Sequence, residues 1–366
     1  MNMELKAPLR AQKSKVDIVD CDFHPRIAYE QLKPHLSERW WQYLHTYGIR
    51  QRHGHAKGYQ FPKITPLASR RDAWPPTGGP PGSDIDFIRK QHLDSYGIGH
   101  AILTPLSPAG FGEQNADFSA AMATAANEAQ AEFWVGEEPR FRASICVPYE
   151  DGVAAAREIR RCAGRREFVQ VFMLSRTSEA LGRRRYWPIY EAAVEAGLPV
   201  GIHVFGSSGW AGTNTGWPSY YIEETTENAT SAQALITSFL MEGVFERYRD
   251  LKVVLIESGF GFLPALGWRL DRNWKRMRDE VPHLKRAPSE YMREHLWVTT
   301  QPMEETEKPE HLIDLMNWIG LDRILFSSDY PHWDFDDPFM AMPGSLSDEQ
   351  RRRIYAGNAK ALYGLA

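Results

Sequence analysis

This sequence of 366 residues has few cysteines, no long hydrophobic run and no large excess of charge of either sign. The three cysteines, Cys21, Cys146 and Cys162, form no CxxC spacing. This argues against a disulfide framework or a thiolate zinc site and favours a reducing compartment. No apolar stretch reaches the ~18 residues of a membrane-spanning helix, and residues 1–15 lack the apolar run of a signal peptide. We therefore expect a cytoplasmic protein with no membrane partner.

The charges nearly balance, with 43 basic and 47 acidic residues and a formal net charge of -4. Such a balance does not favour a nucleic-acid partner, which would be attracted by a basic surface. Hydrophobic residues make up 43% and charged residues 25% of the chain, as in ordinary folded domains. The 12 tryptophans exceed what simple packing needs and indicate either an aromatic-lined pocket or a subunit interface.

Short apolar segments alternate with helical patterns along the whole chain. The predicted strands are residues 16–23, 100–104, 141–147, 168–174, 198–204, 251–257, 296–300 and 323–328. The predicted helices are residues 29–47, 120–137, 152–165, 186–196, 228–248, 263–279, 309–319 and 347–362. This alternation predicts an α/β protein with a (β/α)₈ barrel, and a doubly wound open sheet is the alternative. We expect residues 1–15 to be a tail and residues 16–366 to be one domain.

Two long loops interrupt the alternation. Residues 49–83 form a Pro/Gly-rich insertion after the first strand, and residues 205–227 follow the fifth strand. Both follow strands, so in a barrel they lie on the catalytic face, as active-site or interface loops. His53 and His55 lie in the first loop, and we expect them to be surface residues.

The first strand ends in alternating polar residues, Asp20, Asp22 and His24. Alternate residues of a strand point to the same side, so these three share one face. Two buried carboxylates and an imidazole destabilise one another unless a cation lies among them. The alternative interpretation is a strand-end turn with an aspartate cap.

Three further predicted strands end in side chains that can bind metals. Taken alone, His203 could be a core histidine and Glu257 could form a salt bridge. Together, four strand ends bring such groups to one rim of the barrel. The predicted metal ligands are Asp22, His24, His203, Glu257, Asp329 and His332. Nitrogen and oxygen donors without thiolates suit Mn, Fe or Zn. Asp20 is expected to orient a ligand rather than to bind the ion.

The motifs Asp-x-Asp-x-His after the first strand, WPIYEAAVEAGLPVGIH before His203 and ILFSSDYPHWD around Asp329 resemble the amidohydrolase superfamily. The resemblance covers residues 16–364 and is to the branch that includes aminocarboxymuconate semialdehyde decarboxylase. It implies a metal-dependent barrel in which Asp22, His24, His203 and Asp329 are ligands.

The sequence departs from that family at two positions of the site. The family usually has histidine at the position of Asp22, although some of its decarboxylases have an acidic residue there. Its sixth strand supplies a histidine that acts as general acid or base, where this chain has Glu257. A nearby cation depresses the pKa of a carboxyl group. We therefore expect Glu257 to be a ligand or a bridge between ions.

Three carboxylates and three imidazoles exceed what one ion needs. The main hypothesis is therefore a site for two ions, Fe and/or Mn, in a dioxygen-activating hydroxylase. It resembles nonheme di-iron or manganese–iron monooxygenases of this superfamily, some of which pair with related subunits. The alternative is a mononuclear hydrolase or decarboxylase, for which Zn is also possible. A non-catalytic paralogous subunit is a third reading, and we expect a homo-oligomer or a hetero-oligomer with a paralogue.

Several further residues are candidates for binding and catalysis on a small organic substrate. Glu257, His332 and Tyr330 are the candidate catalytic residues, with Tyr330 as a hydrogen-bond donor to a substrate or metal-bound oxygen. Arg176 could hold a carboxylate, or it could be a solvated residue beside the basic run 183–185. The predicted apolar wall of the pocket, for which loop packing is the alternative, is Trp210, Trp217, Trp333 and Phe335.

Overall fold

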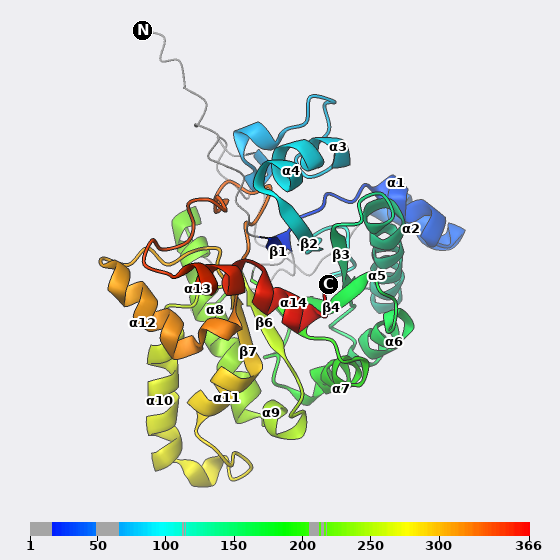
Figure 1. The fold of residues 1–366 in the computed structure, drawn as a ribbon. Coiled ribbons are helices and arrows are strands. Elements are labelled where there is room, and N and C mark those ends of the chain that lie inside the picture. Colours follow the sequence, from blue (N-terminus) through cyan, green and yellow to red (C-terminus); the bar gives the residue numbers. More distant parts are fainter. Residues whose placement is uncertain are drawn as a thin grey trace.

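The computed structural model describes residues 17–48, 66–111, 113, 115–204, 212–213, 216 and 218–366. Within these ranges, eight parallel strands follow one another in chain order, and each strand is hydrogen-bonded to the next (Figure 1). Helices cover the outside of the sheet. This confirms the predicted (β/α)₈ barrel and excludes the open-sheet alternative, whose strand order is not sequential.

The predicted strands and most of the predicted helices are present. The strands are β1 (Ile18–Phe23), β2 (Ile98–Leu103), β3 (Phe141–Cys146), β4 (Phe168–Leu174), β5 (Val200–His203), β6 (Val253–Ile256), β7 (Leu296–Thr299) and β8 (Ile324–Leu325). The helices are α1 (Tyr29–Leu32), α2 (Glu38–Tyr47), α3 (Ile85–Ile88), α4 (Asp94–Tyr96), α5 (Ala116–Ala129), α6 (Gly152–Cys162), α7 (Trp187–Ala196), α8 (Tyr221–Met241), α9 (Val244–Arg247), α10 (Leu263–Arg276), α11 (Pro288–His295), α12 (Pro309–Ile319), α13 (Asp348–Arg352) and α14 (Asn358–Tyr363).

The first and last strands meet and nearly close the barrel. The backbone N–H of Cys21 donates to the carbonyl of Phe326 at 2.9 Å, and Phe23 and Tyr330 form a parallel bridge. The N–H of His24 then donates to the carbonyl of Tyr330, also at 2.9 Å. The polar ends of β1 and β8 are therefore held side by side.

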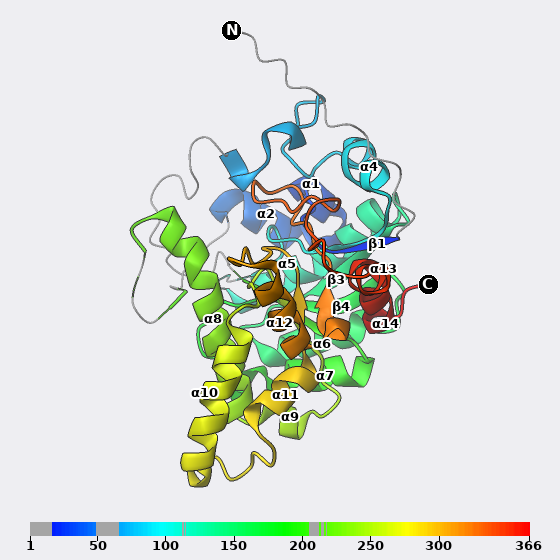
Figure 2. The same cartoon turned by 60° about the vertical axis from the view of Figure 1, so that its left-hand side comes forward.

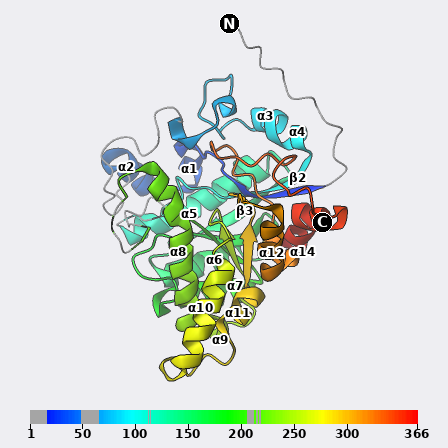
Figure 3. The ribbon, with the colours of Figure 1, turned by 90° about the vertical axis from the view of Figure 1, so that its left-hand side faces the viewer.

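Local sequence signals explain how the elements between the strands begin and end. Asp151 caps α6, because its carboxylate accepts hydrogen bonds from the N–H groups of Val153 and Ala154. Gly197 ends α7 with a left-handed φ of 67°, a conformation that glycine adopts without steric cost. On another flank, α8 and α10 contact each other (Figure 3).

Three helical segments differ from the sequence prediction. Residues 85–96 are helical, with the π-helical turn Arg89–Leu93 between α3 and α4. The wide π turn breaks the 3.6-residue period on which helix prediction depends. The eight-residue helix α11 was also not expected, and α8 begins at Tyr221 rather than at residue 228.

The part of the insertion that the structure describes lies against the loop that follows β8 (Figure 2). Ser69 pairs with His332 in an antiparallel bridge, and the N–H of Trp333 donates to the carbonyl of Ala68 at 2.7 Å. His53, His55, Trp210 and Trp217 lie outside the described residues. Among the described helices, none is long and apolar enough to cross a membrane.

Candidate metal centre

Asp22 and His24, at the end of β1, are held by the same threonine. Thr104, just after β2, donates its hydroxyl to Asp22 Oδ1 at 2.7 Å. Its carbonyl accepts from His24 Nδ1 at 2.8 Å, so Nε2 is left as the ring nitrogen with a free lone pair. Both side chains are buried. The strand thus presents one carboxylate oxygen and one imidazole nitrogen to the barrel mouth.

His203 and Glu257 come from the ends of β5 and β6. His203 Nε2 lies 2.9 Å from Glu257 Oε2 and 3.7 Å from Asp22 Oδ2. The ring of His203 meets the ring of His24 edge-on, with centroids 5.1 Å apart. Glu257 has a left-handed φ of 57°, and its N–H donates to Thr299 Oγ1 at 3.0 Å. A non-glycine residue in this region is strained, as is common at functional sites.

Asp329, in the loop after β8, joins two histidines. Its Oδ1 lies 2.8 Å from His24 Nε2 and 2.7 Å from His332 Nδ1. Like Glu257, it has a left-handed φ, at 60°. The rings of His24 and His332 are 4.3 Å apart between centroids. All six predicted ligands are therefore brought together at the carboxyl ends of the strands.

These side chains and Asp334 form three overlapping groups, and within each group the donor atoms lie within 4.8 Å of one another. The groups are Asp22, His24, His203 and Glu257; His24, Asp329 and His332; and Glu257, Asp329 and Asp334. Three of the atoms, Asp22 Oδ2, His24 Nε2 and His203 Nε2, are buried and are not satisfied by any hydrogen bond in the described part of the chain. The carboxylate oxygens of Asp329 and Glu257 lie 2.8 and 2.9 Å from the two Nε2 atoms. They cannot accept a hydrogen bond there, because each ring carries its proton on Nδ1, which faces a backbone carbonyl. Buried polar atoms are costly when they are unsatisfied. A cation would satisfy all three, so these residues fit a metal ion.

The pKa shifts of these residues also favour a bound metal ion. Burial raises the pKa of Asp22 well above its usual value; His203 lowers it, while Asp329 and Glu257 raise it again. Burial and Asp329 likewise raise the pKa of Glu257. Burial, with His332 nearby, lowers the pKa of His24 to about 4, so this ring is neutral at pH 7, as a metal ligand must be. The neighbouring described residues supply too little positive charge to balance these buried carboxylates, and a divalent ion would supply it.

Two residues at the centre, Asp334 and Gln301, are not among those predicted from the sequence. Burial and the charge of Asp329 raise the pKa of Asp334 to about 8. Gln301, at the end of β7, places its amide nitrogen 3.4 Å from Asp329 Oδ2. The acidic run after His332 was a visible signal for Asp334, but an exposed loop has the same composition. Gln301 carries no comparable signal.

Asp20 lies behind the ligands. Its carboxylate is fully buried and accepts hydrogen bonds from Ser328 and His92 rather than facing the donor atoms of the three groups. This is the location expected for a residue that orients a ligand.

The catalytic role predicted for Tyr330 does not fit its position. The hydroxyl donates to Gln91 Oε1 at 2.6 Å, and Gln91 belongs to none of the three groups. The ring stacks on Phe23 and His92, with centroids 5.4 and 4.5 Å away. This packing fixes the direction of the hydroxyl, so Tyr330 is corrected to a packing residue.

Two predicted substrate-binding residues are paired with α8. Arg176 is buried after β4, and its Nη1 lies 3.2 Å from Glu224 Oε1. It is therefore not the solvated arginine of the alternative reading. Trp333 is 45% exposed and donates its indole N–H to the hydroxyl of Tyr221 at 3.1 Å.

Phe335 does not join Trp333 in a common wall. Its ring lies under the guanidinium of Arg70, 4.1 Å from the ring centroid, and packs against Tyr96 and Tyr330. It therefore belongs to the contact between the insertion and the loop after β8.

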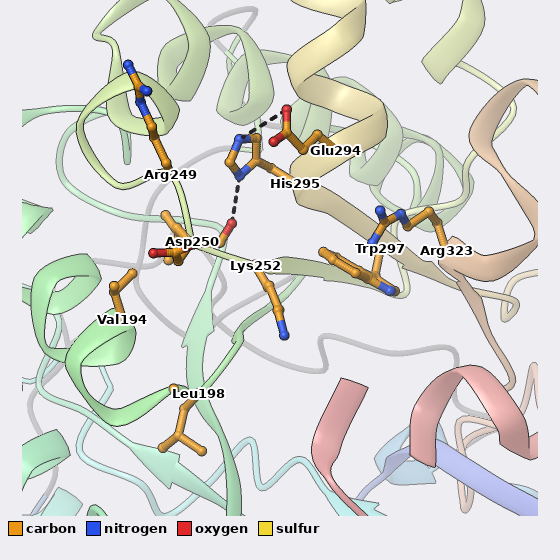
Figure 4. A pocket seen from close by; sticks show the side chains of 11 residues that line it. Val194, Leu198, Arg249, Asp250, Lys252, Glu294, His295, Trp297 and Arg323 are labelled. Carbon is orange, nitrogen blue, oxygen red and sulfur yellow. Dashed lines mark hydrogen bonds and ion pairs between the residues drawn. The ribbon is translucent and has the colours of Figure 1, made fainter. Parts of the chain in front are cut away.

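A cavity of about 390 Å³ opens at the other end of the barrel (Figure 4). Its lining includes residues within two positions of the starts of β5, β6, β7 and β8, namely Leu198, Lys252, His295 and Arg323. The candidate ligands follow the opposite ends of these strands. Active sites of such barrels lie at the carboxyl ends, so this cavity is not the candidate active site.

Comparisons with known proteins agree with this architecture. A family model described as amidohydrolase matches residues 19–365. Gamma-resorcylate decarboxylase of Polaromonas sp. is 32% identical over 304 residues, which cover 77% of this chain and 88% of that protein.

Two solved structures share the fold. An amidohydrolase of Mycobacterium avium subsp. paratuberculosis has a TM-score of 0.72 at 22% identity, covering 96% of this chain and all of that one. The dihydroxybenzoic acid decarboxylase of Polaromonas sp., with bound manganese and the inhibitor 2-nitroresorcinol, has a TM-score of 0.64 at 24% identity, covering 96% and 97%. The chain, which the family model matches almost from end to end, belongs to the amidohydrolase family.

Proposed function

We propose that this chain is an enzyme that decarboxylates a small, hydroxylated aromatic acid with the help of one divalent ion. The observation that carries the proposal is the convergence of Asp22 Oδ2, His24 Nε2 and His203 Nε2, buried and without hydrogen-bond partners within the described residues. The decarboxylase relative supports the reaction, and the manganese in a structural neighbour supports the ion. When bound, the ion supplies positive charge for a substrate carboxylate and for the negative charge that develops during the reaction.

A residue beside the candidate ligands can donate the proton that decarboxylation requires. Loss of CO₂ breaks a carbon–carbon bond and leaves an electron pair on the substrate carbon, which must take up one proton. His332 is suited to deliver it, because Asp329 holds its Nδ1 and leaves Nε2 for the substrate. Its side chain is 19% exposed, against 0% for Asp329. We assign Glu257 to metal binding, beside His203, and His332 to proton delivery rather than to metal binding.

Anaerobic turnover tests this proposal. The protein is loaded with Mn²⁺, Fe²⁺ or Zn²⁺ and mixed with gamma-resorcylate, and CO₂ release is measured without oxygen. We expect release that depends on the metal, and loss of turnover in His332→Gln with metal binding retained. Gamma-resorcylate is the first of a panel of hydroxybenzoates. No metal-dependent CO₂ release from any member would overturn the proposal.

A dioxygen-dependent hydroxylase with two ions is the second candidate. It was the main hypothesis from the sequence, and the decarboxylase relatives do not support it. One observation favours it: Glu257, Asp329 and Asp334 form a further acidic group that shares residues with both others. Substrate-dependent oxygen uptake and two ions per chain would identify this activity.

A further inference from the structure

The carboxylate of Asp20 connects the strand that carries Asp22 to the loop that carries Asp329. Its Oδ1 accepts from the backbone N–H of Ser328 at 2.9 Å, and its Oδ2 accepts from the Ser328 hydroxyl at 2.6 Å. Asp20 and Ser328 are both 0% exposed. Hydrogen bonds that a buried carboxylate accepts are among the stronger hydrogen bonds in proteins.

Ser328 in turn fixes the backbone on both sides of Asp329. Its hydroxyl oxygen accepts from the N–H of Tyr330 at 3.2 Å, while the N–H of Asp329 donates to the carbonyl of Asp22 at 3.2 Å. Asp329 has the strained φ of 60°, so its conformation must be imposed by its neighbours. The bonds from Ser328 to Asp20 are part of what imposes it.

Asp20 Oδ1 also accepts from the backbone N–H of Asp22 at 3.3 Å. His92 is a further partner of Asp20 and comes from outside the barrel, in the π-helical turn Arg89–Leu93. Its Nε2 lies 2.8 Å from Asp20 Oδ2, and both side chains are 0% exposed. Its Nδ1 is buried and has no hydrogen-bond partner among the residues described, so the ring proton belongs on Nε2, where the carboxylate accepts it. The ring also stacks on Tyr330, at 4.5 Å between centroids and 22° between planes.

The surrounding backbone reinforces this connection. The N–H of Arg70 donates to the carbonyl of Pro331 at 2.9 Å, next to the bridge between Ser69 and His332. The connection between β1 and β2 therefore supports the loop after β8 along its length, with His92 as the side chain that reaches the polar interior.

We infer that His92 is a positioning residue for the metal centre: it holds Asp20, and through Asp20 and Ser328 it holds Asp329 in its strained conformation. The inference rests on the proposed metal site. Partners of metal ligands commonly change metal affinity by ~10–100-fold when they are removed. His92 is therefore expected to set the affinity for the ion without touching it.

Mn²⁺ affinity, measured by calorimetry on the full chain, tests the inference in three variants. His92→Phe removes the N–H donor but keeps a ring that can stack on Tyr330. His92→Gln restores a donor near the position of Nε2. Ser328→Ala removes the hydroxyl that donates to the same carboxylate.

His295 offers a matched control, His295→Phe. It is 2% exposed, its Nδ1 donates to the carbonyl of Leu251 at 2.8 Å, and its ring stacks on Phe245 at 4.4 Å. It lies at the opposite end of the barrel, in the lining of the cavity shown in Figure 4. This control matches the change in chemistry and burial but not the connection to Asp329.

We expect His92→Phe to weaken Mn²⁺ binding by ~10–100-fold and His92→Gln to recover most of that loss. Ser328→Ala should also weaken binding, and the double variant should lose less than the product of the two effects, because both act through Asp20. His295→Phe should lower the melting temperature and leave Mn²⁺ affinity unchanged.

Wild-type affinity in His92→Phe would overturn the inference and make His92 purely structural, whatever the result for Ser328→Ala. If His92→Phe does not fold, the comparison of Ser328→Ala with His295→Phe decides. Failure of the wild-type chain to bind any divalent ion would instead refute the proposed function, so the two failures are distinct.

Discussion

The Nε2 atom of His24 lies 2.8 Å from Oδ1 of Asp329, and this contact joins the end of the first strand to the loop after the last. The two side chains are 6% and 0% exposed. The backbone carbonyl of Asp22, two residues before His24, accepts a hydrogen bond from the backbone N–H of Asp329. The candidate metal centre therefore lies across the seam where the barrel closes, and its geometry depends on that closure.

Replacement of Asp329 by Asn tests the seam directly. The variant keeps the shape of the side chain but removes a negative charge from the ligand set. We expect Mn²⁺ affinity to fall by more than the ~10–100-fold typical of residues that only support a ligand. The control is Asp322→Asn, the same change at a 65% exposed residue that pairs with Arg323 near the amino ends of the strands. Unchanged affinity in Asp329→Asn would exclude Asp329 as a ligand.

The metal content of Glu257→Ala distinguishes a centre that holds one ion from a centre that holds two. If the centre holds two ions, the variant should retain about one ion per chain, because Asp22, His24 and His203 still hold the other. Metal content is measured by elemental analysis of wild type and variant, each loaded with manganese and with iron. One ion per chain in both proteins would exclude the two-ion hydroxylase and leave the decarboxylase proposal.

Gly82→Ala probes the contact between the insertion and His24. Gly82 has a φ of 76°, and an added Cβ would lie 2.7 Å from the carbonyl oxygen of His24. Gly78 is the matched position, with a φ of 89° and nothing within 4 Å of an added Cβ.

Both glycine variants should lose ~1–2 kcal/mol of stability, since left-handed backbone is unfavourable for alanine. Only Gly82→Ala should also weaken Mn²⁺ binding, because the carbonyl of His24 must move. Chemical unfolding and calorimetry measure the two effects. Equal Mn²⁺ affinity in both variants would show that the insertion does not constrain His24.

Glu138→Gln is expected to destabilise the fold in a pH-dependent way. Hydrogen bonds from Arg140 lower the pKa of Glu138 to about 2, against the opposing effect of burial, and Arg89 contributes further. In the unfolded chain the pKa of a glutamate carboxyl group is ~4.3. The stabilisation from the charged form is thus complete above that pH and is lost as the pH falls through about 2.

The free energy of unfolding should therefore drop by ~2 kcal/mol in Glu138→Gln at pH 7, the range for hydrogen bonds to charged groups. The difference from wild type should shrink at pH 3. Urea unfolding at the two pH values measures it. Glu195→Gln, whose partner Arg160 is about half exposed, should show no measurable change at either pH. A Glu138→Gln effect that is the same at both pH values would contradict the role of charge.

Sequence alone determined the barrel and the set of candidate ligands. Eight apolar runs separated by amphipathic segments leave few arrangements other than sequential parallel strands, each followed by a helix. Such strands end at one rim, so polar residues at the ends of the first, fifth, sixth and eighth strands had to meet there. The alternation of side chains along β1 placed Asp20, Asp22 and His24 on one face for the same local reason.

Only the tertiary structure decided which way the side chains around the ligands point. Tyr330 directs its hydroxyl to Gln91 because its ring packs on Phe23 and His92, and these contacts join residues far apart in the sequence. The bond from His92 to Asp20 depends on how the connection between β1 and β2 folds back over the barrel. Periodicity reports which face of a strand or helix is buried, whereas side-chain direction in a close-packed interior is set by neighbours from other elements.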